Sequence, residues 1–377
     1  MTREPEPPFA MLAELSHRCP LRCPYCSNPL ALEPAAGELD TATWCRVFDE
    51  VAEAGALQVH LSGGEPCVRR DLEELVAHAA RAGLYVNLIT SAVTLDRARL
   101  ERLRDAGLSH VQISFQGTEP AEADRIAGMP GAHARKLRAA REVVETGLAL
   151  TVNAVIQRST IERVDAFFDL ALDLGAGRIE IANVQYYGWA LANRAALMPT
   201  RDQLVRMDRR VKERLPSLKG RLVVDYVVPD YYAHRPKACM GGWGRRFLNV
   251  TPTGKVLPCH AAETIPGMVF ETVFDRPLGA IWRDGAAFVR YRGTDWMPSP
   301  CRECDRKEAD WGGCRCQALA ITGDAGATDP VCDLSPLHHR MAEIAERDAA
   351  ADPPLLYRDP TAKAPPAEAA PARAAHR

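Results

Sequence analysis

The segment HRCPLRCPYCSNP, residues 17–29, places three cysteines in the spacing C-x3-C-x2-C. These are Cys19, Cys23 and Cys26, and no fourth cysteine lies nearby. The segment directly follows MLAELS (11–16), an apolar run with the length of a buried β-strand. Three thiolates can bind three of the four irons of a [4Fe–4S] cluster, which leaves an open coordination position at the fourth iron. Open positions are typical of catalytic metal sites, so the missing fourth ligand itself indicates catalysis.

Two other interpretations of this segment remain open. His17 or His60 could complete a zinc site, because zinc is commonly bound by cysteine and histidine together. The three cysteines could also cluster at the surface without binding any metal.

The chain from about residue 11 to residue 185 alternates short apolar runs with amphipathic segments. Two amphipathic segments, 71–83 and 94–107, end in glycine, the usual residue after a helix C-terminus. Strands that alternate with helices of this length predict βα units on a parallel sheet. The strands are expected at 11–16, 57–62, 84–90, 110–115, 150–156 and 178–184.

Six such units are too few for a closed eight-stranded barrel, and no dinucleotide-binding fingerprint follows the first strand. We therefore predict an α/β fold with a partial (β/α)6 TIM-like barrel, whose site lies at the carboxyl ends of the strands. The cysteine segment follows the first strand and falls at that end.

The pattern changes beyond residue 185. A charged helix is expected at 200–215 and a further strand at 221–228, whereas the region from Cys239 to Cys332 is rich in Gly, Pro and Cys. Such a region buries too little apolar surface by itself and is expected to need metal to fold. The predicted domains are a barrel at 8–228, a cysteine-rich domain at 229–345 and a disordered Ala/Pro-rich tail at 346–377.

Composition narrows the class of protein. The net charge of −2 indicates neither a nucleic-acid surface nor a basic membrane anchor. No apolar run approaches the ~20 residues that span a bilayer, and the N-terminus has no secretory pattern, so we expect a cytoplasmic protein. Cytoplasmic thiols stay reduced, and the 12 cysteines therefore indicate metal binding or catalysis before disulfides.

The cysteine segment, with Tyr25 before its last cysteine, resembles the signature of the radical S-adenosylmethionine (SAM) enzymes. The sequence SGGEP (62–66) stands at the end of the second expected strand, where that family has its GGEP motif. Two glycines let the main chain approach a ligand closely, and Glu65 offers an anionic acceptor for a cation. The resemblance implies that the three cysteines hold a catalytic [4Fe–4S] cluster whose open iron binds SAM. Electron transfer then gives a 5′-deoxyadenosyl radical that abstracts a substrate hydrogen.

The resemblance also implies which residues contact SAM. They come from the cysteine segment, from the GGEP motif and from the ends of the later strands: Tyr25, Gly63, Gly64, Glu65, Thr90, Ser91, Ser114, Gln116 and Asn153. The residues at the strand ends have a second interpretation, because polar side chains often line the mouth of a barrel without binding any ligand.

The C-terminal cysteines resemble the SPASM extension, which binds auxiliary iron–sulfur clusters in peptide-modifying radical SAM enzymes. The resemblance implies two closed sites of four ligands each. One set is Cys239, Cys259, Cys314 and Cys316, and the other is Cys301, Cys304, Asp310 and Cys332. Asp310 stands where the pattern has a cysteine, so it is either an iron ligand or an ordinary surface residue. Taken without the first cysteine segment, the C-x2-C pair and the cysteines after it would equally suit a zinc ribbon.

The segments 183–201 and 85–95, together with Asp310, resemble the radical SAM enzymes of pyrroloquinoline quinone (PQQ) biosynthesis. The resemblance implies a bond between a glutamate γ-carbon and a tyrosine ring carbon in a ribosomal precursor peptide. It also implies a small peptide chaperone and an external electron donor such as flavodoxin. Tyr186, Tyr187 and Trp189 fit either substrate contact or packing at the barrel mouth.

Two alternatives to this function remain. Another SPASM enzyme, for sulfatase maturation or thioether formation, would use the same clusters on a different peptide. A non-catalytic iron–sulfur electron carrier would keep the closed sites but has no use for an open three-cysteine segment.

Overall fold

The computed structural model describes residues 4–227 and 230–359, and this part of the chain contains one nine-stranded sheet. The strand order is β7-β6-β5-β4-β3-β2-β1-β8-β9, and all neighbours are parallel except β8 and β9. The strands are β1 (Ala10–Ser16), β2 (Gln58–Gly63), β3 (Tyr85–Thr90), β4 (His110–Phe115), β5 (Ala149–Ile156), β6 (Arg178–Asn183), β7 (Val223–Tyr226), β8 (Phe247–Val250) and β9 (Val256–Leu257). The predicted partial barrel of six βα units is confirmed, and β7 and β8 extend it at its two edges.

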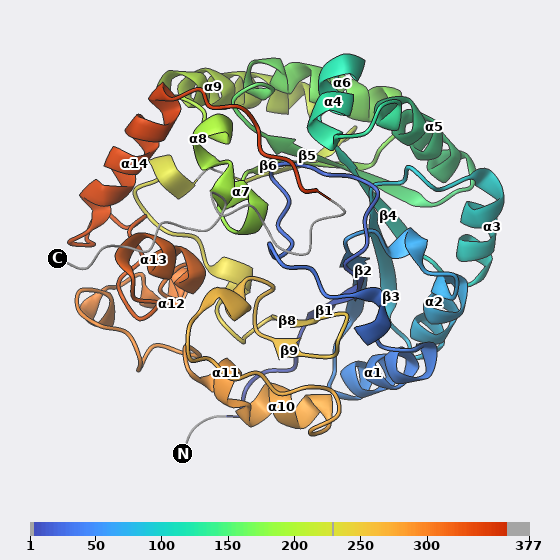
Figure 1. Ribbon diagram of the computed structural model, residues 1–377, viewed down its shortest axis with the longest axis horizontal. Helices are drawn as coiled ribbons and strands as arrows, with labels where there is room; N and C mark the ends of the chain where they lie inside the picture. Colours follow the sequence, from blue (N-terminus) through green and yellow to red (C-terminus); the bar gives the residue numbers. More distant parts are fainter. Residues whose placement is uncertain (1–3, 228–229, 360–377) are drawn as a thin grey trace.

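Helices form the outer layer around the strands (Figure 1). The α-helices are α1 (Thr41–Glu53), α2 (Leu72–Arg81), α3 (Arg97–Asp105), α4 (Pro120–Ala127), α5 (Ala132–Glu145), α6 (Val164–Asp173), α7 (Gly188–Ala192), α8 (Arg194–Leu197), α9 (Arg201–Leu218), α10 (Leu278–Asp284), α11 (Ala286–Val289), α12 (Lys307–Asp310), α13 (Arg315–Thr322) and α14 (His338–Ala350). Within the described ranges, no helix has both the length and the apolar character that crossing a membrane requires.

The period of two in the strands separates the core from the barrel interior. In β4, Val111, Ile113 and Phe115 are fully buried, whereas the alternate residues are polar and partly accessible. The apolar face packs against the helices and forms the large hydrophobic core. The polar face lines the inside of the open barrel, where a reaction centre can be built.

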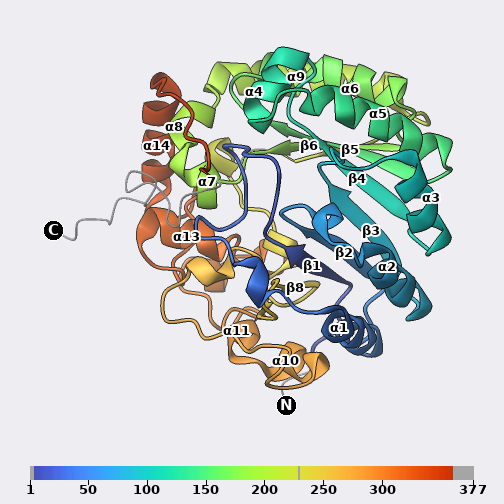
Figure 2. The same ribbon diagram turned by 45° about the vertical axis from the view of Figure 1, so that its right-hand side comes forward.

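The C-terminal region lies between the two edges of the open sheet (Figures 1 and 2). The predicted boundary at residues 228 and 229 does not separate two cores, because β8 pairs with β1 and Val250 joins the barrel core. Ile281 on α10 belongs to the same core. A separate small core surrounds the cysteines, where Trp243 and Tyr291 pack near Cys259.

The predicted disorder of residues 346–377 is wrong for residues 346–359, and residues 360–377 lie outside the described residues. Helix α14 continues to Ala350, and the nine residues after it have defined positions. The buried Asp348 pairs with Arg194 on α8 at 2.6 Å, and Arg158 donates to main-chain oxygens near the end of α14. Such long-range partners order a segment whose composition alone predicts disorder.

We predict that Arg158→Ala loosens this attachment. The Arg158 guanidinium donates to four main-chain oxygens, those of Met198, Ala195, Asp348 and Ala351. Their loss should lower the free energy of unfolding by about 3 kcal/mol, measured by urea denaturation with tryptophan fluorescence. Arg209→Ala, at an exposed position of α9, is the control and should change stability by less than about 0.5 kcal/mol.

Candidate active site

The segment with the first three cysteines forms a loop at the carboxyl end of β1; residues 17–29 are called the cluster loop below. Its middle is fixed by Leu21, which packs with Val93, Ala127 and Ala132. The Arg22 amide donates to the Ala127 oxygen at 2.8 Å. The loop therefore rests on the C-terminal end of α4, with the thiols at the mouth of the barrel.

The GGEP turn after β2 contacts the start of the cluster loop through main-chain atoms. The Gly64 amide donates to the Ser16 oxygen at 2.6 Å, and the Glu65 amide donates to the Arg18 oxygen at 2.8 Å. Gly63 has φ +111°, and a Cβ there would lie 2.4 Å from the Ser16 oxygen. A Cβ on Gly64 would lie 2.5 Å from the His17 oxygen. Only glycine permits this approach, so the motif serves the geometry of the cluster loop directly.

The Glu65 carboxylate is fully buried and accepts several hydrogen bonds. The Thr90 hydroxyl donates at 2.6 Å, the Ser91 amide at 2.8 Å, and the Ser91 hydroxyl also donates. The Cys67 amide donates at 3.0 Å. Thr90 and Ser91, predicted as SAM contacts, thus hold Glu65 in place at the ends of β2 and β3.

Lys136 on α5 is a buried cation at this site that the sequence interpretation missed. Its Nζ donates to the Ser114 oxygen at 2.7 Å and to the Gln116 side chain. Burial lowers the pKa of Lys136 to about 8, and the thiols of Cys23 and Cys19 oppose that shift. Lys136 occupies the apolar face of α5 in line with Ala132, Ala139, Ala140 and Val143, and this pattern was the available signal.

Two further predicted SAM contacts, Ser114 and Asn153, belong to a polar layer inside the barrel. Ser114 on β4, Asn153 on β5 and Glu180 on β6 are register neighbours. Asn153 donates to the Glu180 carboxylate at 2.9 Å, and burial raises the pKa of Glu180. The Tyr25 hydroxyl is buried near Gln116 without a hydrogen bond of good geometry in the described part of the chain. An unsatisfied buried hydroxyl at the mouth of the barrel is available to a ligand.

The electrostatics of the cluster loop fit a metal site. Burial raises the pKa of Cys19 and of Cys23 to about 12 each, with Glu65 adding to the shift of Cys19 and Lys136 opposing that of Cys23. Burial also raises the pKa of Cys26. Three thiolates there need a compensating positive charge, and bound iron provides it. Neither candidate histidine joins them. His17 uses both ring nitrogens, one with Glu14 and one with the Glu33 amide, and His60 pairs with Asn87 inside the barrel.

The structure brings the four cysteines of the first auxiliary set together. Cys239 and Cys314 lie within hydrogen-bonding reach of each other, as do Cys239 and Cys259. Cys316 completes a ring, because it reaches both Cys259 and Cys314. Cys259 and Cys316 are buried, and Cys239 and Cys314 are partly buried. The four cysteines come from different parts of the cysteine-rich region, as the ligands of a closed metal site do.

Tyr187 and His260 form a half-buried pair between the cluster loop and the first auxiliary set. The Tyr187 hydroxyl hydrogen-bonds the His260 Nε2, and the two rings lie 5.1 Å apart. Burial raises the pKa of Tyr187, the nearby Cys259 thiol adds to this shift, and Ser27 opposes it. The other two aromatic residues predicted at the barrel mouth are Tyr186 and Trp189. Tyr186 packs edge-on against Tyr231, and Trp189 is buried.

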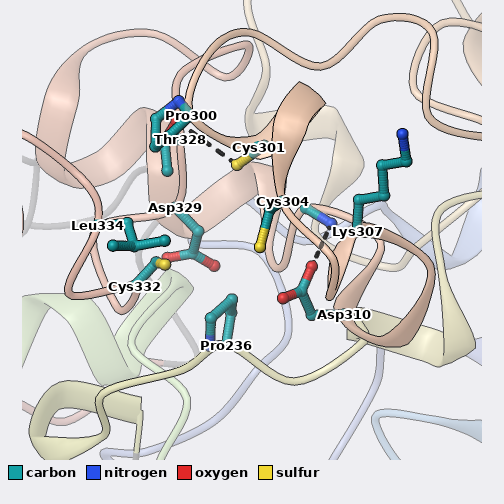
Figure 3. A pocket seen from close by; sticks show the side chains of 11 residues that line it. Pro236, Pro300, Cys301, Cys304, Lys307, Asp310, Thr328, Asp329, Cys332 and Leu334 are labelled. Atoms are coloured by element: carbon teal, nitrogen blue, oxygen red, sulfur yellow. Dashed lines mark hydrogen bonds between the residues drawn. The ribbon is translucent and has the colours of Figure 1, made fainter.

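The second auxiliary set lines one pocket (Figure 3). Cys301, Cys304 and Cys332 border it together with Asp310. Asp310 is only 8% exposed, so it is not an ordinary surface residue, and one carboxylate oxygen accepts from the Gly312 amide at 3.0 Å. The other oxygen of the Asp310 carboxylate points into the pocket (Figure 3), where it can reach a ligand.

Asp329 is a further carboxylate of this pocket that the sequence interpretation missed. It accepts from the Cys314 amide at 2.7 Å and from Gln317 at 3.1 Å, so it connects the two auxiliary sites. Burial raises the pKa of Asp329 to about 7, with the Cys314 thiol adding to the shift. The nearby Arg315 is buried and donates to the main-chain oxygens of Gly312, Ala325 and Ala327.

Within the described residues, no three His, Cys, Asp or Glu side chains adopt the spacing of a site for one metal ion. The assignment of iron–sulfur clusters therefore depends on the thiol sets, their burial and the glycine contact with the cluster loop. The three cysteines of the cluster loop are partly buried. The cysteines of the first auxiliary set lie within hydrogen-bonding reach of one another, and the second auxiliary set borders one pocket.

Comparisons with known proteins agree with both parts of the chain. The profile of the radical SAM superfamily matches residues 13–171, and that of the SPASM iron–sulfur cluster-binding domain matches residues 239–305. A PqqA peptide cyclase from Gluconobacter oxydans is 58% identical over 354 residues, covering 94% of this chain and 98% of the relative. One from Granulibacter bethesdensis is 57% identical over 353 residues, covering 94% of each chain.

Solved structures share the fold at low sequence identity. SuiB of Streptococcus suis, bound to S-adenosylmethionine, has a TM-score of 0.72 at 18% identity, covering 87% of this chain and 78% of that one. The protein anSMEcpe with bound AdoMet has a TM-score of 0.63 at 15% identity, covering 91% of this chain and 94% of that one. At this identity the likeness establishes the architecture alone.

We predict that Gly64→Ala disrupts the mouth of the barrel. Its Cβ would meet main-chain atoms of the cluster loop, which cannot move without displacing the first cysteine. Iron content after anaerobic reconstitution should fall, and SAM binding measured by equilibrium dialysis should weaken at least about tenfold. Gly177→Ala is the matched control, because a Cβ there meets no atom within 4 Å, and it should leave both quantities unchanged.

Proposed function

Because this chain belongs to the family of PqqA peptide cyclases, radical SAM proteins with a SPASM extension, we propose that it joins a glutamate to a tyrosine in a PqqA-type precursor peptide. The new bond would connect the glutamate γ-carbon to a carbon of the tyrosine ring, and the product would be lighter by two hydrogens. The observation that carries this proposal is the identity of 57–58% over about 94% of the chain.

The residues of the barrel mouth support binding of a [4Fe–4S] cluster and SAM. When bound, these groups supply a 5′-deoxyadenosyl radical that abstracts hydrogen. Cys19, Cys23 and Cys26 would hold the cluster, and their number leaves one iron open for SAM. The glycine turn shapes the loop around them, and the polar layer with Ser114 and Asn153 offers hydrogen-bonding groups for the rest of SAM.

Glu65 and Lys136 supply opposite charges near the thiols of the cluster loop. After burial, the negative charge of Glu65 is the main cause of the raised pKa of Cys19. Burial also raises the pKa of Cys23, and the positive charge of Lys136 opposes that shift. The methionyl part of SAM carries an ammonium and a carboxylate, which these two side chains match in sign. We assign Glu65 to the ammonium and Lys136 to the carboxylate.

The auxiliary sets support a role as electron acceptors. After the carbon–carbon bond forms, the peptide must lose one electron and one proton. A closed site with four protein ligands cannot bind substrate directly, but it can accept an electron. Asp310 would be the fourth ligand of the second site, and a carboxylate there would change its reduction potential relative to four thiolates.

The remaining partners and the alternative functions follow from this assignment. We propose the peptide chaperone and an electron donor such as flavodoxin on the resemblance alone. Sulfatase maturation and thioether formation would need other peptides, and the identity to PqqA peptide cyclases favours neither. A non-catalytic electron carrier would not need the glycine turn, Glu65 or Lys136, so that alternative does not explain why they surround the cluster loop.

The decisive experiment is anaerobic reconstitution followed by reduction, addition of SAM and mass spectrometry. Reactions are run with and without a Glu/Tyr-containing PqqA peptide and its chaperone. Deoxyadenosine together with a peptide lighter by two hydrogens supports the proposal. Deoxyadenosine with an unchanged peptide would contradict the proposed substrate. If protein with a full complement of iron forms no deoxyadenosine, the proposed radical reaction is contradicted.

Lys136→Met should weaken SAM binding about tenfold or more, because it removes the cation assigned to the carboxylate. Lys136→Arg keeps the charge and should restore part of the affinity. Equilibrium dialysis of reconstituted protein measures both. Equal affinity in wild type and Lys136→Met would remove the assignment.

Changes in the second auxiliary set should separate SAM cleavage from peptide cyclisation. Cys301→Ala and Asp310→Ala should lose the iron of one cluster and abolish cyclised peptide, while deoxyadenosine formation partly persists. Asp310→Cys should retain iron but alter the electron paramagnetic resonance (EPR) spectrum. Cys45→Ala changes a cysteine outside all three sets and is the control. Wild-type iron content in Asp310→Ala would argue against ligation.

A further inference from the structure

The nine residues after α14 cross the mouth of the barrel toward the cluster loop. Residues 351–359 are called the C-terminal strap below. In Figure 1 the red segment leaves α14, passes α8 and ends near the dark-blue loop that follows β1, and Figure 2 shows the same course. The strap starts at Ala351, whose oxygen accepts from Arg158, and Arg158 also lies 3.8 Å from Asp352.

Asn193, between α7 and α8, joins the strap to the cluster loop. Its side-chain oxygen accepts from the Leu356 amide at 2.7 Å, and its Nδ2 donates back to the Leu356 oxygen at 2.9 Å. The same Nδ2 lies 3.0 Å from the Pro24 oxygen, between the second and third cysteines. Asn193 is 3% exposed, so this pairing is buried. One side chain thus sets the position of the strap relative to the loop.

Tyr357 attaches the strap to the other side of the loop. Its hydroxyl donates to the Arg125 oxygen at 2.8 Å, near the end of α4. Arg22 of the cluster loop donates to the Gly128 oxygen at 3.0 Å, at the same helix end. The strap and the loop therefore share a support on α4.

Arg358 contacts the cluster loop directly. Its Nη2 donates to the Leu21 oxygen at 2.6 Å and to the Cys19 oxygen at 3.0 Å. These two carbonyls lie at and just after the first cysteine. The guanidinium is also close enough to Cys23 and Cys26 for its positive charge to favour their thiolates.

We propose that Arg358 is a positioning residue for the radical SAM cluster, carried to the cluster loop by the C-terminal strap. It holds the main chain around Cys19 in the conformation that presents the thiols, and it contributes positive charge beside the ligands. This inference rests on the proposed use of Cys19, Cys23 and Cys26 as cluster ligands. It makes the C-terminal strap part of the active site.

The experiment compares Arg358→Ala, Arg358→Lys and a chain that ends at Asp352 with the reconstituted wild type. The controls are Arg340→Ala, at an exposed position of α14, and a chain that ends at Asp359, which keeps the described strap. Hydrogen–deuterium exchange of peptides covering residues 19–28 reports the order of the loop. EPR during a redox titration, with and without SAM, reports the cluster; the signal that Cys19→Ala removes identifies it.

Arg358→Ala and the chain ending at Asp352 should exchange about tenfold faster in the loop, because two hydrogen bonds that restrain it are lost. Both should shift the midpoint potential to more negative values, since a nearby positive charge favours the reduced, more anionic cluster. Arg358→Lys should restore the potential but only part of the protection, because an ammonium lacks the fixed fork of a guanidinium. Both controls should match wild type.

If Arg358→Ala has the hydrogen–deuterium exchange rates and the midpoint potential of wild type, the inference is overturned. This outcome does not depend on whether the protein cyclises a peptide. A strap effect that is present while wild type forms no cyclised peptide would contradict the proposed function and leave this inference standing. If the chain ending at Asp352 fails to fold, the point variants decide the question alone.

Discussion

The geometry of the site depends on one close main-chain contact, between the GGEP turn and the start of the cluster loop. Gly63 and Gly64 bring the end of β2 against residues 16–18 at distances that no side chain permits. This contact brings Glu65 close enough to the first cysteine for its charge to act on the thiol, and it joins the ends of β1 and β2 through main-chain hydrogen bonds. Every other feature of the site is arranged around that junction.

The charges around the junction come from elements far apart in the sequence. Glu65 follows β2, Lys136 lies on α5, and Arg358 is close to the end of the chain. Each is buried or partly buried, and each forms hydrogen bonds with main-chain, amide or hydroxyl groups of neighbouring strands and loops. The fully protonated thiols are costly to ionise in this setting, so the site is arranged for a ligand that brings its own positive charge.

Much of the site could be predicted from local patterns. The cysteine spacing, the GGEP turn and the cysteines of the SPASM region could be assigned because each motif is short and contiguous, or repeats at a known spacing. The buried position of Asp310 agrees with its predicted place in a ligand set. Lys136 and Asp329 could not be assigned with the same ease, since their chemistry arises only when helix and loop bring them to the thiols. The cysteine-rich region was expected to stand apart, yet β8 pairs with β1, and no local pattern encodes that pairing.

The sequence by itself determined the six βα units of the barrel and the set of three cysteines without a fourth nearby, because residue periodicity and spacing are local properties. Its motifs also carried the resemblance to the radical SAM and SPASM enzymes. Only the tertiary structure decided that residues 346–359 are ordered, that Asn193 ties the strap to the cluster loop and that Arg358 reaches the Cys19 carbonyl. The physical reason is that an Ala/Pro-rich segment has little intrinsic preference for order, so its conformation is set by distant hydrogen-bonding partners rather than by its own residues.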